Sequence, residues 1–158
     1  MNKLMLLILP IILFTACVKS DPAPTNKCDE VTAVAPTAEV NTLKAYLDTN
    51  HITYTQDSRG FFYIMDSVGT GGSANICNYV TVSYAGTLLN GTLFDQSADA
   101  SFYLSQLILG WQEAIPLMKQ GGRMTLYLPP SLGYGSQAFS SIPANSNLKF
   151  IITLRGIN

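Results

Sequence analysis

The sequence predicts an α+β domain in which a curved antiparallel sheet of about five to six strands wraps one short central helix. Apolar and polar residues alternate in several separate stretches after Gly60, which is the pattern of strands that bury one face. A single stretch among them, about 110–118, has helical character and ends at Gly121-Gly122. The length of 158 residues suggests one domain, which a signal, a tether and a short helix precede.

The first 16 residues predict a secretory signal peptide. Lys3 is their only charged residue, an apolar run extends from Leu4 to Phe14, and small residues precede Cys17. That run is too short for a comfortable membrane span. Residues 13–17, Leu-Phe-Thr-Ala-Cys, resemble a bacterial lipobox, which implies a mature protein that begins at a lipidated Cys17 and is anchored by lipid. An ordinary cleavable signal with an incidental cysteine is the alternative.

Residues 17–37 predict a flexible tether, because they contain three prolines and several small residues but no aromatic side chain. The segment 38–73 follows as an N-terminal helix and first strand region. Residues 61–65 are aromatic and β-prone and are bounded by turn residues, so they predict the first strand. The helix is expected over 38–50, because apolar residues there have helical spacing, namely Val40, Leu43 and Leu47.

Further strands are expected in residues 74–158, the main domain. Tyr79–Leu88 alternates, and Asn90-Gly91 after it is a strong signal for a tight hairpin with positive φ at both turn positions. This turn leads to a short strand at 92–95. Pro116 limits the central helix because it removes a backbone donor. Two later strands are predicted by alternating apolar residues, Met124, Leu126 and Leu128 in one and Phe150, Ile152 and Leu154 in the other.

The charge balance excludes several classes of function. Nine basic and ten acidic residues give a formal net charge of −1, so the chain lacks the basic face that a nucleic-acid-binding protein needs. His51 is the only histidine and is expected to be an exposed polar residue at a helix end. A histidine-dependent triad or a histidine-rich metal site is therefore not expected.

Two cysteines remain besides Cys17. In an oxidising compartment outside the cytoplasm, Cys28 and Cys77 could form a disulfide that ties the N-terminal segment to the main domain. Two unpaired thiols are the alternative. No CxxC spacing or Cys/His cluster occurs, so no metal site is expected.

Four motifs occur in order between Asn75 and Asn158. They are Val82–Leu88 with Asn90–Asp95, then Gln106–Ala114, Leu128–Gly135 and Ile142–Phe150. They resemble the signatures V-x-Y-x-G-x-L … G-x-x-F-D, V-I-x-G-W-x-E, I-P-x-x-x-A-Y-G and I-P-x-x-x-L-x-F of FKBP-type peptidyl-prolyl isomerases. Each motif alone is weak, but four in register are specific. The resemblance implies an FKBP-like fold and rotation about X-Pro bonds.

The resemblance also implies roles for individual residues. The Ile108 amide and the Tyr134 hydroxyl would hydrogen-bond substrate carbonyls, and Asp95 would place a carboxylate near the carbonyl that rotates, beside Tyr84. Trp111 would form the floor of a pocket for the proline ring. The other residues implied in this substrate-binding pocket are Phe94, Phe102, Leu107, Phe139, Ile142 and Phe150. Bond rotation requires a dry apolar pocket and no nucleophile, metal or cofactor.

Simpler interpretations exist for the same residues. The aromatic side chains could pack in a core, and Asp95 could cap a turn. Residues 95–101 are expected to form a short loop without the basic residue that many family members pair with this aspartate, so Tyr84 or another hydroxyl is expected to hold Asp95. Phe139 lies near a place where histidine is common in the family, which favours apolar substrate contacts.

The leading hypothesis is a lipid-anchored prolyl isomerase that assists the folding of bacterial envelope proteins. Its expected partners are proline-containing polypeptides, the membrane through Cys17, and macrolide inhibitors of the pocket. A second hypothesis is a non-catalytic module that binds proline-containing segments as a holdase or assembly factor. A third is a structural lipoprotein that uses the fold as a scaffold.

Overall fold

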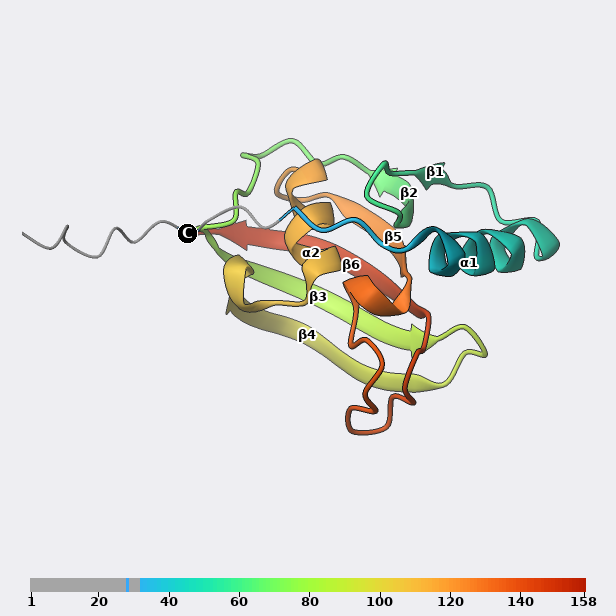
Figure 1. The fold of residues 1–158 in the computed structure, drawn as a ribbon. Coiled ribbons are helices and arrows are strands. Elements are labelled where there is room, and N and C mark those ends of the chain that lie inside the picture. The colour runs from blue at the N-terminus through green and yellow to red at the C-terminus, as the bar shows by residue number, and fades with distance from the viewer. Residues whose placement is uncertain (1–27, 29–31) are drawn as a thin grey trace, which may run out of the picture.

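The computed structural model describes Cys28 and residues 32–158 (Figure 1). The signal segment 1–16, Cys17 and most of the expected tether lie outside the described residues. Within the described part of the chain, no helix has the length and apolar character needed to cross a membrane.

One antiparallel sheet of six strands organises the domain, in the order β1-β2-β5-β6-β3-β4. This confirms the α+β class and the expected number of strands. The strands are β1 (Thr55–Gln56), β2 (Phe62–Ser67), β3 (Tyr79–Leu88), β4 (Leu93–Tyr103), β5 (Arg123–Leu128) and β6 (Leu148–Ile157).

The central helix α2 (Leu109–Ala114) packs against this sheet (Figure 1). It is shorter than the stretch 110–118 expected from the sequence, because the chain tightens into a 3-10 turn at Ile115–Leu117 around Pro116. Gly110 permits the close approach, since a Cβ there would overlap the Leu128 side chain of β5. Two more 3-10 turns lie at Leu104–Gln106 and Pro130–Leu132.

The N-terminal helix α1 (Thr37–Thr49) begins and ends one residue before the predicted range. Its predicted apolar residues, Val40, Leu43 and Leu47, are all buried and belong to the same hydrophobic core as the sheet. The segment 38–73 therefore packs onto the main domain and supplies β1 and β2 to its sheet. His51 follows the helix in an exposed position with a φ of 55°.

The chain before α1 differs from the flexible tether expected through residue 37. The Ala35 amide donates a hydrogen bond of 2.8 Å to the Arg59 carbonyl, and Ala35 is only 5% exposed. The expectation rested on composition, which does not reveal that a small side chain can fit beside Gly60. A Cβ on Gly60 would touch Ala35 and overlap Val40.

The hairpin between β3 and β4 has a different turn from the predicted one. Gly91 has a φ of 88°, but Asn90 is not among the residues with positive φ. The Gly91 amide bonds the Leu88 carbonyl at 3.0 Å, so the turn begins one residue earlier and Gly91 follows it. A glycine in the left-handed region directly after a turn forms a β-bulge, and this arrangement is compatible with the right-handed twist of the two strands.

β4 continues where the sequence predicted a loop. Residues 95–101 lie within the strand Leu93–Tyr103, which pairs with β3 along its length. Two register shifts accompany this pairing, between Val82 and Tyr84 and between Gly86 and Thr87. Small polar residues obscured the strand in the sequence, because β4 is an edge strand whose side chains are mostly exposed.

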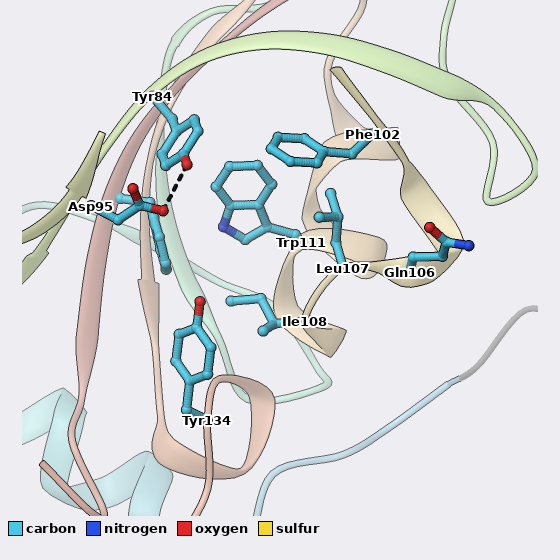
Figure 2. Close-up of a pocket in the computed structure, with 9 residues that line it drawn as sticks. Tyr84, Asp95, Phe102, Gln106, Leu107, Ile108, Trp111 and Tyr134 are labelled. Carbon is cyan, nitrogen blue, oxygen red and sulfur yellow. Dashed lines mark hydrogen bonds between the residues drawn. The ribbon is translucent and has the colours of Figure 1, made fainter. Parts of the chain in front are cut away.

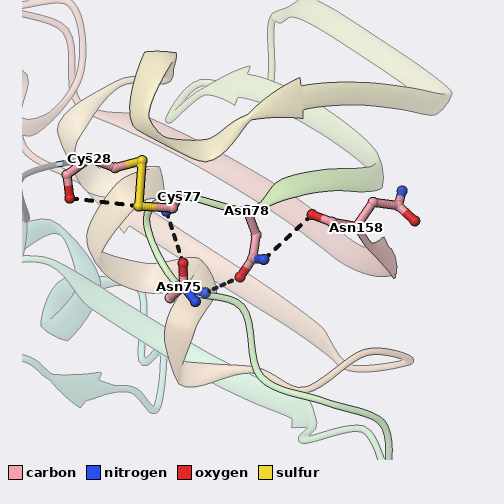
Figure 3. The surroundings of a disulfide bond; sticks show 5 residues. All are labelled: Cys28, Asn75, Cys77, Asn78 and Asn158. Carbon is pink, nitrogen blue, oxygen red and sulfur yellow. Dashed lines mark hydrogen bonds between the residues drawn. A yellow bond between two sulfur atoms is a disulfide. The ribbon is translucent and has the colours of Figure 1, made fainter. Parts of the chain in front are cut away.

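Cys28 and Cys77 form a disulfide in the structure (Figure 3). Their Cα atoms are 5.2 Å apart, and 49 positions separate them in the sequence. Around them, the Cys77 amide donates to the Asn75 side chain at 3.0 Å, and the Asn78 side chain accepts from the Asn75 amide at 2.8 Å. The bond joins the N-terminal segment to the residues just before β3.

Candidate functional site

A cavity of about 250 Å³ opens between α2, the sheet and the loop after β5 (Figure 2). Its lining comes from β3, β4, the segment 106–111, the loop after β5, and β6, so only the folded chain brings these side chains together. Most of the lining is aromatic or aliphatic, which is typical of small ligand sites. The lining residues are Tyr84, Asp95, Phe102, Gln106, Leu107, Ile108, Trp111, Tyr134 and Phe150.

Trp111 is buried at one side of the cavity and is 4% exposed. Its ring makes edge contacts with Tyr84 and Phe150, in both cases with 5.2 Å between ring centroids. The three rings come from α2, β3 and β6, so the helix and the sheet position this surface jointly. The indole Nε1 is buried without a hydrogen-bond partner among the described residues and faces the side where Asp95 and Tyr134 lie (Figure 2).

The polar side of the cavity contains the pair Tyr84 and Asp95. The Tyr84 hydroxyl donates a hydrogen bond of 2.7 Å to Oδ2 of Asp95 (Figure 2). Burial, followed by this contact with the carboxylate, raises the pKa of Tyr84 well above its usual 10.0. The tyrosine therefore remains a donor at any physiological pH. Its hydroxyl holds Asp95, as expected from the absence of a basic residue in positions 95–101.

Two hydrogen-bond donors at the cavity are available to a ligand. Among the described residues, neither the Ile108 amide nor the Tyr134 hydroxyl has a hydrogen-bond partner. Ile108 is held in place because its carbonyl accepts the Trp111 amide at 2.9 Å at the start of α2. Burial, with the nearby Asp95, raises the pKa of Tyr134, so this hydroxyl also keeps its proton.

Eight of the eleven residues implied by the resemblance line this cavity, and three do not. Phe94 lies behind Phe150, at 5.5 Å between ring centroids, because it packs over Gly86. Phe139 is 56% exposed and stacks on Tyr134 at 4.7 Å, outside the cavity. Ile142 is buried in the core, where its backbone pairs with that of Phe139. Phe94 and Phe139 therefore contact lining residues from outside the cavity, whereas Ile142 belongs to the core.

Gln106 lines the cavity although its sequence position did not select it as a site residue. It is the last residue of the 3-10 turn Leu104–Gln106, and its side chain is exposed at the edge of the opening (Figure 2). The available signal was its place directly before Leu107. That signal was weak, because most glutamine side chains are exposed on protein surfaces whether or not a cavity lies beside them.

The cavity offers little to a metal ion. Among the described residues, Asp95 is the only acidic one in its lining, and no group of three or more potential metal ligands occurs. The cavity combines an apolar floor, one carboxylate that a hydroxyl holds, and the Ile108 amide and Tyr134 hydroxyl as donors open to a ligand.

The family model for FKBP-type peptidyl-prolyl cis-trans isomerases matches residues 71–155, more than half of the chain. The chain belongs to this family. Its relatives include the FKBP-type peptidyl-prolyl cis-trans isomerase FkpA of Buchnera aphidicola, which is 44% identical over 108 residues and matches 65% of this chain and 43% of the relative. The peptidyl-prolyl cis-trans isomerase Mip of Coxiella burnetii is 41% identical over 102 residues, which are 61% of this chain and 44% of Mip.

Solved FKBP structures share the fold. The crystal structure of FkpA from Escherichia coli aligns with a TM-score of 0.70 and 31% identity, over 77% of this chain and 60% of that one. The crystal structure of AtFKBP13 aligns with a TM-score of 0.63 and 29% identity, over 67% of this chain and 99% of that one. The chain spans less than half the length of the curated FKBP relatives it matches.

Proposed function

We propose that this FKBP-family chain is a peptidyl-prolyl cis-trans isomerase that catalyses rotation about X-Pro bonds. The observation that carries the proposal is the combination in one cavity of the buried Trp111 surface, the Tyr84–Asp95 pair, and the Ile108 amide and Tyr134 hydroxyl as open donors. Membership of the family supports the same activity.

The physical problem in this reaction is the partial double bond of the amide. Resonance keeps the planar X-Pro bond polar and gives rotation a barrier of about 18–20 kcal/mol. Twisting the bond removes the resonance and with it part of the charge separation. An apolar cavity that excludes water therefore favours the twisted amide over the planar one, and binding energy from the rest of the substrate holds it there.

The lining suggests how a prolyl segment binds. The proline ring lies on Trp111, with Phe102, Leu107 and Phe150 around it. The Ile108 amide and the Tyr134 hydroxyl donate to the carbonyls that flank the ring, which anchors the two ends of the rotating bond. Such positioning reduces the entropy cost of reaching the transition state.

Asp95 acts on the bond itself. When the nitrogen lone pair leaves conjugation, the carbonyl carbon becomes more positive. A carboxylate beside this carbon stabilises the twisted state more than the planar one. Tyr84 fixes the direction of the carboxylate through its hydrogen bond of 2.7 Å.

A paired experiment distinguishes the enzyme from a binding module. Exchange between cis and trans forms of a short X-Pro peptide is measured by NMR with the chain from Val18 onward, together with the affinity for the same peptide. We expect faster exchange with the parent chain and a large loss of exchange in Asp95→Val with nearly unchanged affinity. Peptide affinity without accelerated exchange in the parent would instead identify a holdase or assembly factor.

We further propose that the mature protein is a lipoprotein of the bacterial cell envelope, with its domain outside the cytoplasm, where it assists protein folding. The apolar leader and the lipobox-like residues 13–17 support this location. Partition of cell extracts between a detergent phase and an aqueous phase tests this location for the parent and for Cys17→Ser. The parent is expected in the detergent phase and Cys17→Ser in the aqueous phase, whereas an ordinary signal would leave both aqueous.

The same cavity is proposed as the binding site for macrolide inhibitors. Their apolar rings would lie on Trp111, and their carbonyl groups would accept from Ile108 and Tyr134. Inhibition of the NMR exchange by such a macrolide, and its loss in Trp111→Leu, test this assignment.

A further inference from the structure

Helix α2 has a second contact surface on the side opposite the cavity. Glu113 follows Trp111 by two positions, which is about 200° around a helix, so the two side chains leave α2 in nearly opposite directions. Glu113 is 4% exposed, and its Oε1 accepts a hydrogen bond of 2.7 Å from the Ala33 amide, 80 positions earlier in the sequence. The helix therefore lies between the prolyl cavity and the N-terminal segment.

This N-terminal segment, Cys28 with residues 32–36, is called the strap below. It crosses near α2 before the chain enters α1 (Figure 1). The disulfide to Cys77 fixes one end (Figure 3). The hydrogen bond of 2.8 Å from the Ala35 amide to the Arg59 carbonyl fixes the other. The Ala33 amide that Glu113 binds lies between these two fixed points.

A buried carboxylate is costly unless its surroundings compensate the charge. Oε2 of Glu113 lies 4.0 Å from Nε of Arg59, and Arg59 is itself bound by Asp57 through two side-chain hydrogen bonds of 2.7 and 3.0 Å. The guanidinium also lies over the Phe61 ring at 5.0 Å. The acceptor for the strap is thus built into a fixed charged cluster rather than exposed on the surface.

The short helix depends on such external contacts. α2 has only six residues, and helices of this length are unstable without tertiary packing. Nε2 of Gln112 donates to the Leu107 carbonyl at 2.6 Å, which ties the helix to a residue that lines the cavity. The next residue, Glu113, makes the contact with the strap.

We propose that Glu113 is a positioning residue: by binding the Ala33 amide of the strap, it fixes the orientation of α2 and therefore of Trp111 in the cavity. The strap thus helps to set the position of Trp111 at the cavity floor, although none of the strap residues lines the cavity. The kinetic consequence rests on the isomerase activity proposed above, but the orientation of Trp111 does not.

The direct test removes the donor and leaves Glu113 in place. Ala33→Pro deletes the amide proton, and Val34→Pro is the matched control, because Val34 is 68% exposed and its amide has no hydrogen-bond partner among the described residues. Trp111 is the only tryptophan in the chain, so its fluorescence and its quenching by acrylamide report on the floor alone. We expect Ala33→Pro to shift the emission and increase quenching, with Val34→Pro like the parent.

A second series changes the acceptor. Glu113→Gln keeps a side-chain oxygen for the Ala33 amide, whereas Glu113→Ala removes it. We expect kcat/KM for peptide isomerisation to fall about tenfold in Ala33→Pro and Glu113→Ala, mainly in kcat, and to recover in Glu113→Gln. If Glu113→Ala does not fold, Ala33→Pro decides the question.

The two readouts separate failure of this proposal from failure of the proposed function. A folded Ala33→Pro with the fluorescence, quenching and kcat of the parent would overturn the positioning role, as would equal losses in Glu113→Gln and Glu113→Ala. A parent chain without isomerase activity would reject the function, while the fluorescence comparison would still support or overturn the role of Glu113.

Discussion

The Tyr84 hydroxyl and the Asp95 carboxylate form a hydrogen bond of 2.7 Å across the hairpin of β3 and β4. The bond joins an aromatic wall of the cavity to the carboxylate in its lining. Tyr84 and Asp95 are not direct partners in the strand pairing, where Tyr84 lies opposite Ser97 and Asp95 opposite Gly86, so the bond runs diagonally across the two strands. The continuous edge strand β4 therefore contributes directly to the geometry of the site.

Tyr84→Phe is expected to reduce kcat/KM by about five- to tenfold, because the variant loses the hydrogen bond that orients Asp95 and a typical hydrogen bond contributes about 1 kcal/mol. Peptide exchange measured by NMR checks this value. Tyr79→Phe is the control, since Tyr79 pairs with Tyr103 at the far end of β3. Full activity in Tyr84→Phe would show that Asp95 needs no fixed partner.

Gly110→Ala is expected to lower the free energy of unfolding by about 1–3 kcal/mol, because the added Cβ would overlap Leu128 in a packed core. Urea denaturation of the parent and the variant measures the change. Gly72→Ala is the matched control, since a Cβ at Gly72 would meet nothing within 4 Å. Equal losses in both variants would contradict the close packing of α2 on β5.

Glu113 and Asp57 are expected to give opposite pH dependences of stability. Burial raises the pKa of Glu113 above 4.5, so the folded chain keeps this proton to a higher pH than the unfolded chain does. The folded chain therefore loses stability as the pH rises from 4.5 through the pKa of Glu113 in the folded chain. The Arg59 hydrogen bonds lower the pKa of Asp57 below 3.8, so its contribution is present above that value and is lost as the pH falls further.

Urea denaturation at several pH values between 3 and 7 measures both effects. The stability of Glu113→Gln relative to the parent should rise as the pH increases, whereas that of Asp57→Asn should fall. A common direction for the two variants would refute the assigned environments.

Replacing Cys28 and Cys77 together by serine is expected to lower the free energy of unfolding by up to about 4 kcal/mol, because the bond closes a loop across 49 positions. Urea midpoints of the parent, with and without reductant, and of the double variant measure this loss. Reductant should reproduce the effect in the parent and leave the double variant unchanged. An unchanged midpoint in all cases would indicate free thiols.

The sequence predicted the helices and strands in which the spacing of apolar residues marks a buried face. The alternating residues of Tyr79–Leu88 and the spacing of Val40, Leu43 and Leu47 correspond to β3 and to the buried face of α1. The central part of the site was also predictable, because Tyr84, Ile108 and Trp111 belong to motifs of fixed spacing. These features depend on local pattern, which a sequence displays directly.

Features that depend on distant contacts could not be predicted in the same way. β4 is a strand because β3 pairs with it, although its own residues are polar and small. Ala35 is buried because Gly60 leaves room for it, and Glu113 is buried because the strap covers it. Phe139 is aromatic and was therefore expected in the pocket. Its backbone pairs with that of Ile142, and its ring stacks on Tyr134 outside the cavity.

Acceleration of a proline-limited refolding reaction tests the central claim most directly. Refolding of a protein whose slow phase is X-Pro isomerisation is followed with catalytic amounts of the chain from Val18 onward, and with folded Asp95→Val and Trp111→Leu. We expect the parent to increase the rate of the slow phase in proportion to its concentration, and both variants to lose most of that increase. A folded parent that leaves the slow phase unchanged, or variants as active as the parent, would contradict the assignment of this cavity as an isomerase site.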